Sequence, residues 1–162
     1  MKKLSIYLDT SVINFLFADD APDYKKATQE FFEKYFDLYD VYISVVVLVE
    51  INRTLDIEQK KKLLSVIEDY NLHVYGDVTD EIEALANLYL DKKIIPMKKR
   101  EDALHVAFAT YYSFDILLSW NFKHLANVKK QREINIINLG EGYSKPLNLV
   151  NPLEVFYESI DY

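Results

Sequence analysis

The chain alternates short apolar runs with longer stretches in which apolar residues recur every three to four positions. The short, β-branched or leucine-rich runs predict strands at Leu4 to Leu8, Leu72 to Tyr75, Phe114 to Ser119 and Ile134 to Leu139. The helical spacing predicts long helices at Asp23 to Leu38, Glu58 to Tyr70, Thr79 to Leu90 and Arg100 to Tyr112. Shorter helices are expected at Ser11 to Phe17, at Asn121 to Ala126 and from Pro152 towards Tyr157. Strands alternating with helices predict an α/β fold with a mostly parallel central sheet.

The segment Val41 to Ile51 fits two structures. Its run of three valines from Val45 favours a strand, whereas Ser44 is suited to cap a buried helix that ends near Arg53. The pattern alone leans towards the strand.

The chain is expected to form one domain over residues 1–162. It has 162 residues, of which half are apolar, and only three glycines and four prolines. This length supports one well-buried core, and no repeat or flexible linker divides it.

Composition excludes several classes of protein. The absence of cysteine excludes disulfides and thiolate chemistry. The net charge of −7 argues against a protein that coats nucleic acid, although local lysine segments such as Lys98-Lys99-Arg100 can still hold phosphates. Asp9 interrupts the N-terminus before a signal sequence can form, and no apolar run is long enough to span a membrane. The expected location is the cytoplasm, without membrane contact.

Three carboxylates stand out in apolar surroundings. Asp9 follows the first predicted strand, and Glu50 and Asp102 lie within apolar stretches, where a charge is costly unless it is paired or bound to metal. In the alternative interpretation each one caps a helix or pairs with a nearby base: Glu50 with Arg53, and Asp102 with Arg100.

Four segments carry a resemblance to a known family. They are Tyr7-Leu8-Asp9-Thr10-Ser11-Val12-Ile13, Val47-Leu48-Val49-Glu50-Ile51, Arg100-Glu101-Asp102-Ala103-Leu104-His105-Val106-Ala107 and Ile116-Leu117-Leu118-Ser119-Trp120-Asn121. In order and setting they resemble the successive acidic motifs of the PIN domain family, which includes VapC-type toxins of toxin–antitoxin pairs. The resemblance spans a core of about residues 4–140 and leaves 141–162 as a C-terminal extension.

The resemblance implies a three-layer fold and a magnesium- or manganese-dependent ribonuclease acting on RNA. It places Glu50 on a helix that begins near Ser44, and it implies a homodimer and, for a toxin, an antitoxin protein as partner. Three carboxylates within about 5 Å of one another repel by several kcal/mol at an intermediate dielectric. A divalent cation removes that repulsion, and hard oxygen ligands suit Mg²⁺ or Mn²⁺. Asp9 and Asp102 are the expected ligands, whereas Glu50 binds the metal through water or orients the nucleophile.

One position departs from the family pattern. Asn121 stands where an aspartate is common, which removes one negative charge and puts a second metal in doubt. By resemblance, Ser119 helps to position the acidic cluster, and Thr10 or Ser11 does the same at the helix start. Ser11 fits equally well as a simple helix cap.

Histidines and a tryptophan lie near these motifs. His105 is one helical turn from Asp102, and it fits either a position in the cleft or a hydrogen-bonded core. Lys123 and His124, after the last motif, are candidates for phosphate contact. Trp120 could stack a base, although an indole beside a buried strand is more often core.

Two other functions remain compatible with the sequence. A non-catalytic PIN-like module that binds RNA or protein would tolerate loss of the carboxylates. A phosphatase with Asp9 as nucleophile is also conceivable, but that pattern requires a second aspartate where Ser11 stands.

Overall fold

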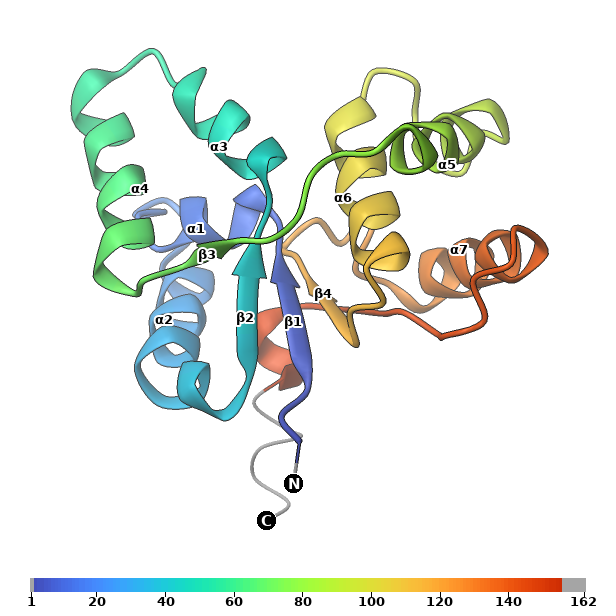
Figure 1. Ribbon diagram of the computed structural model, residues 1–162. Helices are drawn as coiled ribbons and strands as arrows, with labels where there is room; N and C mark the ends of the chain where they lie inside the picture. The colour runs from blue at the N-terminus through green and yellow to red at the C-terminus, as the bar shows by residue number, and fades with distance from the viewer. Residues whose placement is uncertain (1, 156–162) are drawn as a thin grey trace.

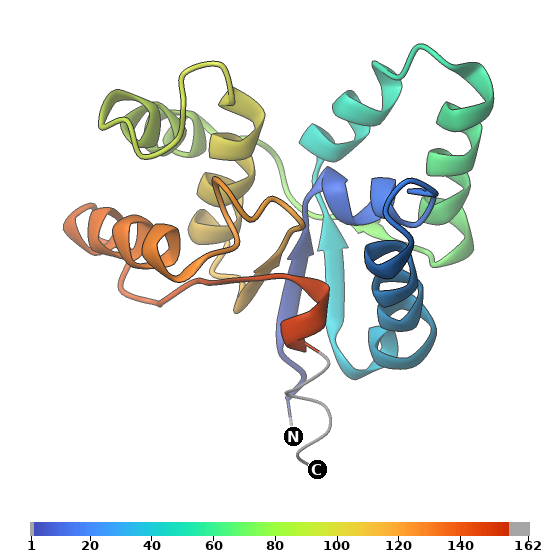
Figure 2. The same cartoon turned by 180° about the vertical axis from the view of Figure 1, so that it is seen from behind.

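The computed structural model describes residues 2–155 and contains a five-stranded, all-parallel sheet in the order β3-β2-β1-β4-β5. The strands are β1 (Ser5–Leu8), β2 (Asp40–Ile43), β3 (His73–Val74), β4 (Ile116–Leu118) and β5 (Asn148–Val150). Helices cover both faces of this sheet, and the chain enters and leaves at the same end of it (Figures 1 and 2). The predicted α/β class with a parallel sheet between helical layers is confirmed.

The seven α-helices that lie wholly within the described residues fall into two groups. One group covers the first face: α1 (Thr10–Phe15), α2 (Pro22–Glu30), α3 (Val45–Asn52) and α4 (Ile57–Asp69). The other covers the opposite face: α5 (Asp80–Asp91), α6 (Arg100–Tyr111) and α7 (Val128–Gly140). The segment predicted as a helix from Asp23 to Leu38 is helical throughout, but only its first part is an α-helix. After α2 the backbone forms a π-helical turn, Phe31–Tyr35, and then a 3₁₀ turn, Phe36–Leu38.

The two faces of the sheet belong to two separate cores. Successive strand residues point to opposite faces, so in β1 the side chains of Ile6 and Leu8 enter the core under α1 to α4. Tyr7, between them, enters the core under α5 to α7 together with Leu117 of β4. All four side chains are inaccessible to solvent, as expected for central strands of a parallel sheet.

The ambiguous segment contains both structures. It begins as strand β2, which ends at Ile43, and Ser44 then caps α3 by accepting a hydrogen bond from the backbone of Val46. The leaning towards a strand is therefore wrong for residues 45–51. The expectation that Glu50 lies on a helix beginning near Ser44 is confirmed.

The C-terminal third departs most from the prediction. The segment Ile134 to Leu139 is not a strand but part of α7, in which Ile134 and Ile137 pack inward while Ile136 and Leu139 are about two-thirds exposed. The edge strand is instead β5, beyond residue 140, and it pairs with β4.

Two shorter predictions also change. Residues 121–126 form turns rather than a helix: the Asn121 side chain accepts a hydrogen bond from the backbone of His124, and the amides of Leu125 and Ala126 both bond to the Asn121 carbonyl. A helix starts at Pro152, but the part of it expected beyond residue 155 lies outside the described residues. No helix among residues 2–155 is long and apolar enough to cross a membrane.

Candidate active site

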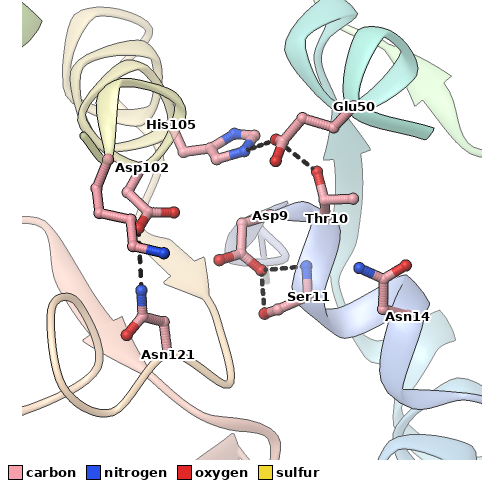
Figure 3. Close-up of a pocket in the computed structure, with 9 residues that line it drawn as sticks. Asp9, Thr10, Ser11, Asn14, Glu50, Asp102, His105 and Asn121 are labelled. Atoms are coloured by element: carbon pink, nitrogen blue, oxygen red, sulfur yellow. Dashed lines mark hydrogen bonds and ion pairs between the residues drawn. The ribbon is translucent and has the colours of Figure 1, made fainter. Parts of the chain in front are cut away.

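One pocket lies at the carboxyl ends of the central strands, where ligands of parallel sheets usually bind. It has a volume of about 180 Å³, far more than the roughly 15 Å³ that one water needs. Three carboxylates from three elements line it: Asp9 before α1, Glu50 from α3 and Asp102 from α6 (Figure 3). The remaining lining residues are Thr10, Ser11, Asn14, Lys99, His105 and Asn121.

Asp9 is fixed by backbone and hydroxyl groups. Its own amide bonds to the carbonyl of Leu118, so the end of β1 stays attached to the end of β4. One carboxylate oxygen caps α1 by accepting from the amide and hydroxyl of Ser11, and the other accepts from the Ser119 hydroxyl at 2.5 Å. Burial raises the pKa of Asp9, although these hydrogen bonds and His105 oppose the rise.

This arrangement corrects one prediction: the cap of α1 is Asp9, and Ser11 lies inside the helix. The capping alternative therefore holds for Asp9, but it does not exclude a functional role. The same carboxylate lines the pocket.

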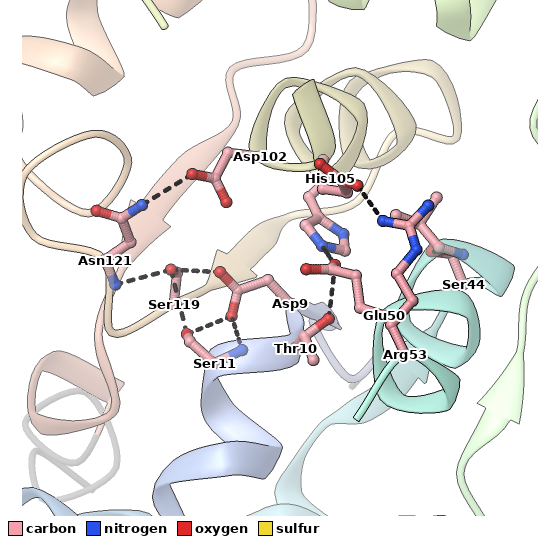
Figure 4. A network of polar contacts seen from close by, with 12 residues as sticks. Asp9, Thr10, Ser11, Ser44, Glu50, Arg53, Asp102, His105, Ser119 and Asn121 are labelled. Carbon is pink, nitrogen blue, oxygen red and sulfur yellow. Dashed lines mark hydrogen bonds and ion pairs between the residues drawn. The ribbon is translucent and has the colours of Figure 1, made fainter. Parts of the chain in front are cut away.

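Glu50 ends a chain of buried polar contacts. Its carboxylate accepts from Nε2 of His105 at 2.5 Å and from the Thr10 hydroxyl at 2.8 Å. Figure 4 shows these contacts of Glu50 with His105 and Thr10. On the other side of the ring, Nδ1 of His105 lies 2.5 Å from the hydroxyl of Tyr7, which lies 2.7 Å from the hydroxyl of Ser44. This series of contacts thus connects the start of α3 to its last turn through side chains of β1 and α6.

This contact shifts the pKa of both partners. Burial raises the pKa of Glu50, but the hydrogen bond and charge of His105 outweigh it and leave the pKa below its usual value. Burial lowers the pKa of His105, and the bond to Glu50 with the charges of Asp9 and Asp102 raises it overall. Glu50 is therefore ionised at neutral pH.

Asp102 is a partly buried carboxylate with a raised pKa. Burial, together with repulsion from Asp9, raises its pKa to about 6. The Asn121 amide donates to it at 3.1 Å, and Lys99 acts on it only through its charge. Ion pairing with the bases named in the alternative interpretation does not occur: Arg53 bonds to Glu101, and Arg100 bonds to Asn87 and lies near Glu83.

The structure brings together most of the predicted site residues. Ser119 lies just behind the pocket as a partner of Asp9, whereas Lys123 and His124 do not line the pocket. Two lining residues were not among the predicted site residues, although Lys99 was named within a basic segment that could hold phosphates. Asn14 lies one helical turn after Thr10, so helical spacing could have placed it on the same face as Thr10. Lys99 belongs to the basic segment that ends at Arg100.

A divalent cation fits the donor chemistry of this pocket. The three carboxylates and the Asn121 amide provide hard oxygen ligands. Burial and the neighbouring charge of Asp9 raise the pKa of Asp102, and a bound cation would offset both effects. As arranged here, however, no group of three or more acidic or histidine side chains among residues 2–155 could hold a metal ion. Each carboxylate is turned towards a different partner, so binding requires a side-chain rearrangement.

The buried chain behind Glu50 leads to a test. Tyr7→Phe removes the hydroxyl between His105 and Ser44 and leaves buried groups without a partner, so we expect the free energy of unfolding to fall by about 1–3 kcal/mol. The matched control is Tyr89→Phe, which removes a buried hydroxyl bonded to Asn138, away from the pocket. Both variants should unfold at a lower urea concentration than wild type. Only Tyr7→Phe should change the Mn²⁺ affinity measured by calorimetry. Equal Mn²⁺ affinities for all three proteins would contradict a link from Tyr7 to Glu50.

Comparison with known proteins identifies the family. The PIN domain family model matches residues 6–130, and none of the curated protein sequences matches the chain. One similar solved structure is VapBC2 from Rickettsia felis bound to a DNA fragment from its promoter (TM-score 0.55, 15% identity, 91% of this chain and 98% of that one). Another is VapBC-5 from Mycobacterium tuberculosis, a member of the VapBC family of toxin–antitoxin systems (TM-score 0.50, 15% identity, 90% and 98%). At this identity the likeness concerns the fold, and the family model covers more than half of the sequence. The chain belongs to the PIN domain family.

Proposed function

We propose that the protein is a metal-dependent endoribonuclease that hydrolyses RNA phosphodiester bonds at the acidic pocket. The observation that carries the proposal is the meeting of Asp9, Glu50 and Asp102, from three separate elements, in one pocket at the carboxyl end of a PIN-domain sheet. Membership of this family also sets aside the phosphatase alternative. Both oxygens of Asp9 accept hydrogen bonds, which supports a fixed ligand rather than a free nucleophile.

Asp9 and Asp102 would hold Mg²⁺ or Mn²⁺, with Asn121 beside them. The cation, when bound, would activate a water and neutralise charge on the phosphoryl oxygens. Glu50, ionised and held by Thr10 and His105, would accept a hydrogen bond from the attacking water and orient it. Thr10, Ser11 and Ser119 would keep the carboxylates in place.

Lys99 lies at the pocket and would contact the phosphate, with Lys123 and His124 nearby. The VapBC neighbours support a further proposal, that the protein is the toxin of a toxin–antitoxin pair, with an antitoxin protein as partner. A homodimer remains a proposal from the family resemblance.

The test is cleavage of a labelled single-stranded RNA by the purified chain. We expect cleavage with Mn²⁺ or Mg²⁺, none with excess EDTA, and recovery when Mn²⁺ is returned, because the carboxylates alone provide no counter-charge for the phosphate. A single-stranded DNA of the same sequence distinguishes RNA from general nucleic-acid cleavage. Cleavage that continues unchanged in EDTA would contradict the proposal.

A non-catalytic RNA- or protein-binding module is the second candidate. It is favoured by the side-chain arrangement, in which each carboxylate already has a protein partner and no described group could hold a metal ion. A melting temperature that responds to neither Mn²⁺ nor Mg²⁺, together with intact RNA in the cleavage assay, would favour this module.

A further inference from the structure

Two exposed aromatic rings pack on Trp120, which immediately precedes the lining residue Asn121, and take no part in the chemistry above. Tyr24 of α2 is 39% exposed, and Phe122, in the loop after β4, is 40% exposed. Their ring centroids are 5.8 Å apart, and both pack on Trp120, at 4.7 Å from Tyr24 and 5.7 Å from Phe122. Trp120 itself is buried, so the ring that the sequence offered for stacking is the support of the two exposed ones.

The aromatic pair is adjacent to the pocket through the backbone. Phe122 follows Asn121, which lines the pocket, and Phe15, which packs on both Tyr24 and Trp120, follows the lining residue Asn14. A base on these rings would therefore be close to a phosphate in the pocket.

The rings are held in place although they are exposed. The Trp120 indole donates to the Thr28 hydroxyl at 2.8 Å, and its backbone amide donates to Ser11. The carbonyl of Phe122 accepts from the Asn127 side chain at 2.6 Å. Rigid aromatic side chains lose little conformational entropy when a ligand covers them, so the pair is prepared for stacking.

Lysines lie near the same loop. Lys98, Lys99 and Lys123 are exposed, and none forms an ion pair within the described part of the chain. Their charges act on His124, whose pKa is lowered first by burial and then by Lys123, Lys130, Lys99 and Lys98. In a chain with a net charge of −7, Lys99 acts on Asp102 through its charge, and the three lysines together also provide positive charge that can hold phosphate groups beside the pocket.

We propose that Tyr24 and Phe122 form a stacking site for a nucleobase of single-stranded RNA, while Lys98, Lys99 and Lys123 hold the phosphates beside it. This inference rests on the proposed ribonuclease function and adds how the substrate is held. Stacking accepts any base because every base has an aromatic face, so the site fixes the strand without reading its sequence. An apolar partner protein could also cover the rings, and the test separates the two.

Binding can be measured without cleavage, because Trp120 is the only tryptophan in the sequence and contacts both rings. Its fluorescence is followed in EDTA at low salt while a 12-nucleotide single-stranded RNA is added. The variants are Phe122→Leu, which keeps apolar volume but removes the ring, and Tyr24→Leu. The control is Tyr75→Leu, because Tyr75 is also 39% exposed but packs on Tyr42, Tyr112 and Phe114. Melting curves check that each variant is folded.

We expect saturable quenching with wild type and with Tyr75→Leu, and binding weaker by roughly 5- to 100-fold with Phe122→Leu and with Tyr24→Leu. A strand of the same length without bases should bind wild type as weakly as normal RNA binds Phe122→Leu. Lys123→Ala should weaken both strands equally and make binding less dependent on salt.

The outcomes separate this inference from the proposed function. RNA that binds through the rings but stays intact with Mn²⁺ would leave the stacking site standing and overturn the ribonuclease. RNA that is cut with Mn²⁺ but binds Phe122→Leu and Tyr24→Leu as it binds wild type would overturn the stacking site alone. Absence of RNA binding by wild type, or equal binding of the strand without bases, would also overturn it and point to a protein partner on these rings.

Discussion

Asp9→Asn should reduce metal-dependent RNA cleavage by at least about a hundredfold. The amide group replaces one carboxylate oxygen and removes a charge at the centre of the pocket, and even residues that only support metal ligands typically affect activity 10- to 100-fold. The fold should survive, because an asparagine at this position can still cap α1 and bond to Ser119.

The initial rate of cleavage with saturating Mn²⁺ measures this effect. Asp91→Asn, an exposed aspartate at the end of α5, is the matched control and should cut RNA at the wild-type rate. An Asp9→Asn protein that cuts within about twofold of wild type would place the activity in another cleft.

Asp102→Asn should stabilise the protein when no metal is present. The pKa of Asp102 is about 6 in the folded chain and near 3.8 when unfolded, so the folded state binds more protons between these values. Stability therefore falls as pH rises from about 4 to 6, and above pH 6 the ionised carboxylate costs on the order of 2 kcal/mol after allowance for its partial exposure. The variant lacks this cost at neutral pH and should match wild type below about pH 4.

Unfolding in urea at pH 7.5 and pH 4, in EDTA and with Mn²⁺, tests both parts of this expectation. Mn²⁺ at a hundredfold excess over its dissociation constant should add about 2.7 kcal/mol to wild type and less to the variant. Asp115→Asn is the control and should have the opposite effect on stability. Burial raises the pKa of Asp115, but Ser5 and Lys145 outweigh it and lower the pKa, so removal of this charge should destabilise the protein at pH 7.5. If Asp102→Asn unfolds at lower urea than wild type at pH 7.5 in EDTA, the pocket is not electrostatically strained.

The acidic residues were accessible to sequence reasoning because each stands out against an apolar background. Asp9 follows a buried strand, and Asp102 lies in the first turn of a helix whose later residues are mostly buried. The position of Glu50 required more than the local pattern, because Val45, Val46 and Val47 favour a strand in isolation. The Ser44 cap and the packing of α3 against the core override that preference.

The errors have a common physical cause in long-range contacts. Ile134 and Ile137 read equally well as strand or helix, and the outcome depends on the core under α7 and on β5, which already occupies the sheet edge beside β4. The link from Glu50 through His105 to Tyr7 joins residues 55 and 98 positions apart, respectively, and no local spacing encodes it. The alternation in β1 shows only that Tyr7 is buried, and a buried hydroxyl then requires a partner.

The location of bound Mn²⁺ tests the central claim most directly. Crystals grown with Mn²⁺ and measured for anomalous scattering reveal the ion independently of any activity assay. We predict a manganese peak in the pocket bonded to carboxylate oxygens of Asp9 and Asp102, with the side chains rearranged from their present partners. No peak in the pocket at saturating Mn²⁺, or a peak bound only by residues outside it, would contradict the assignment of this pocket as the metal-dependent active site.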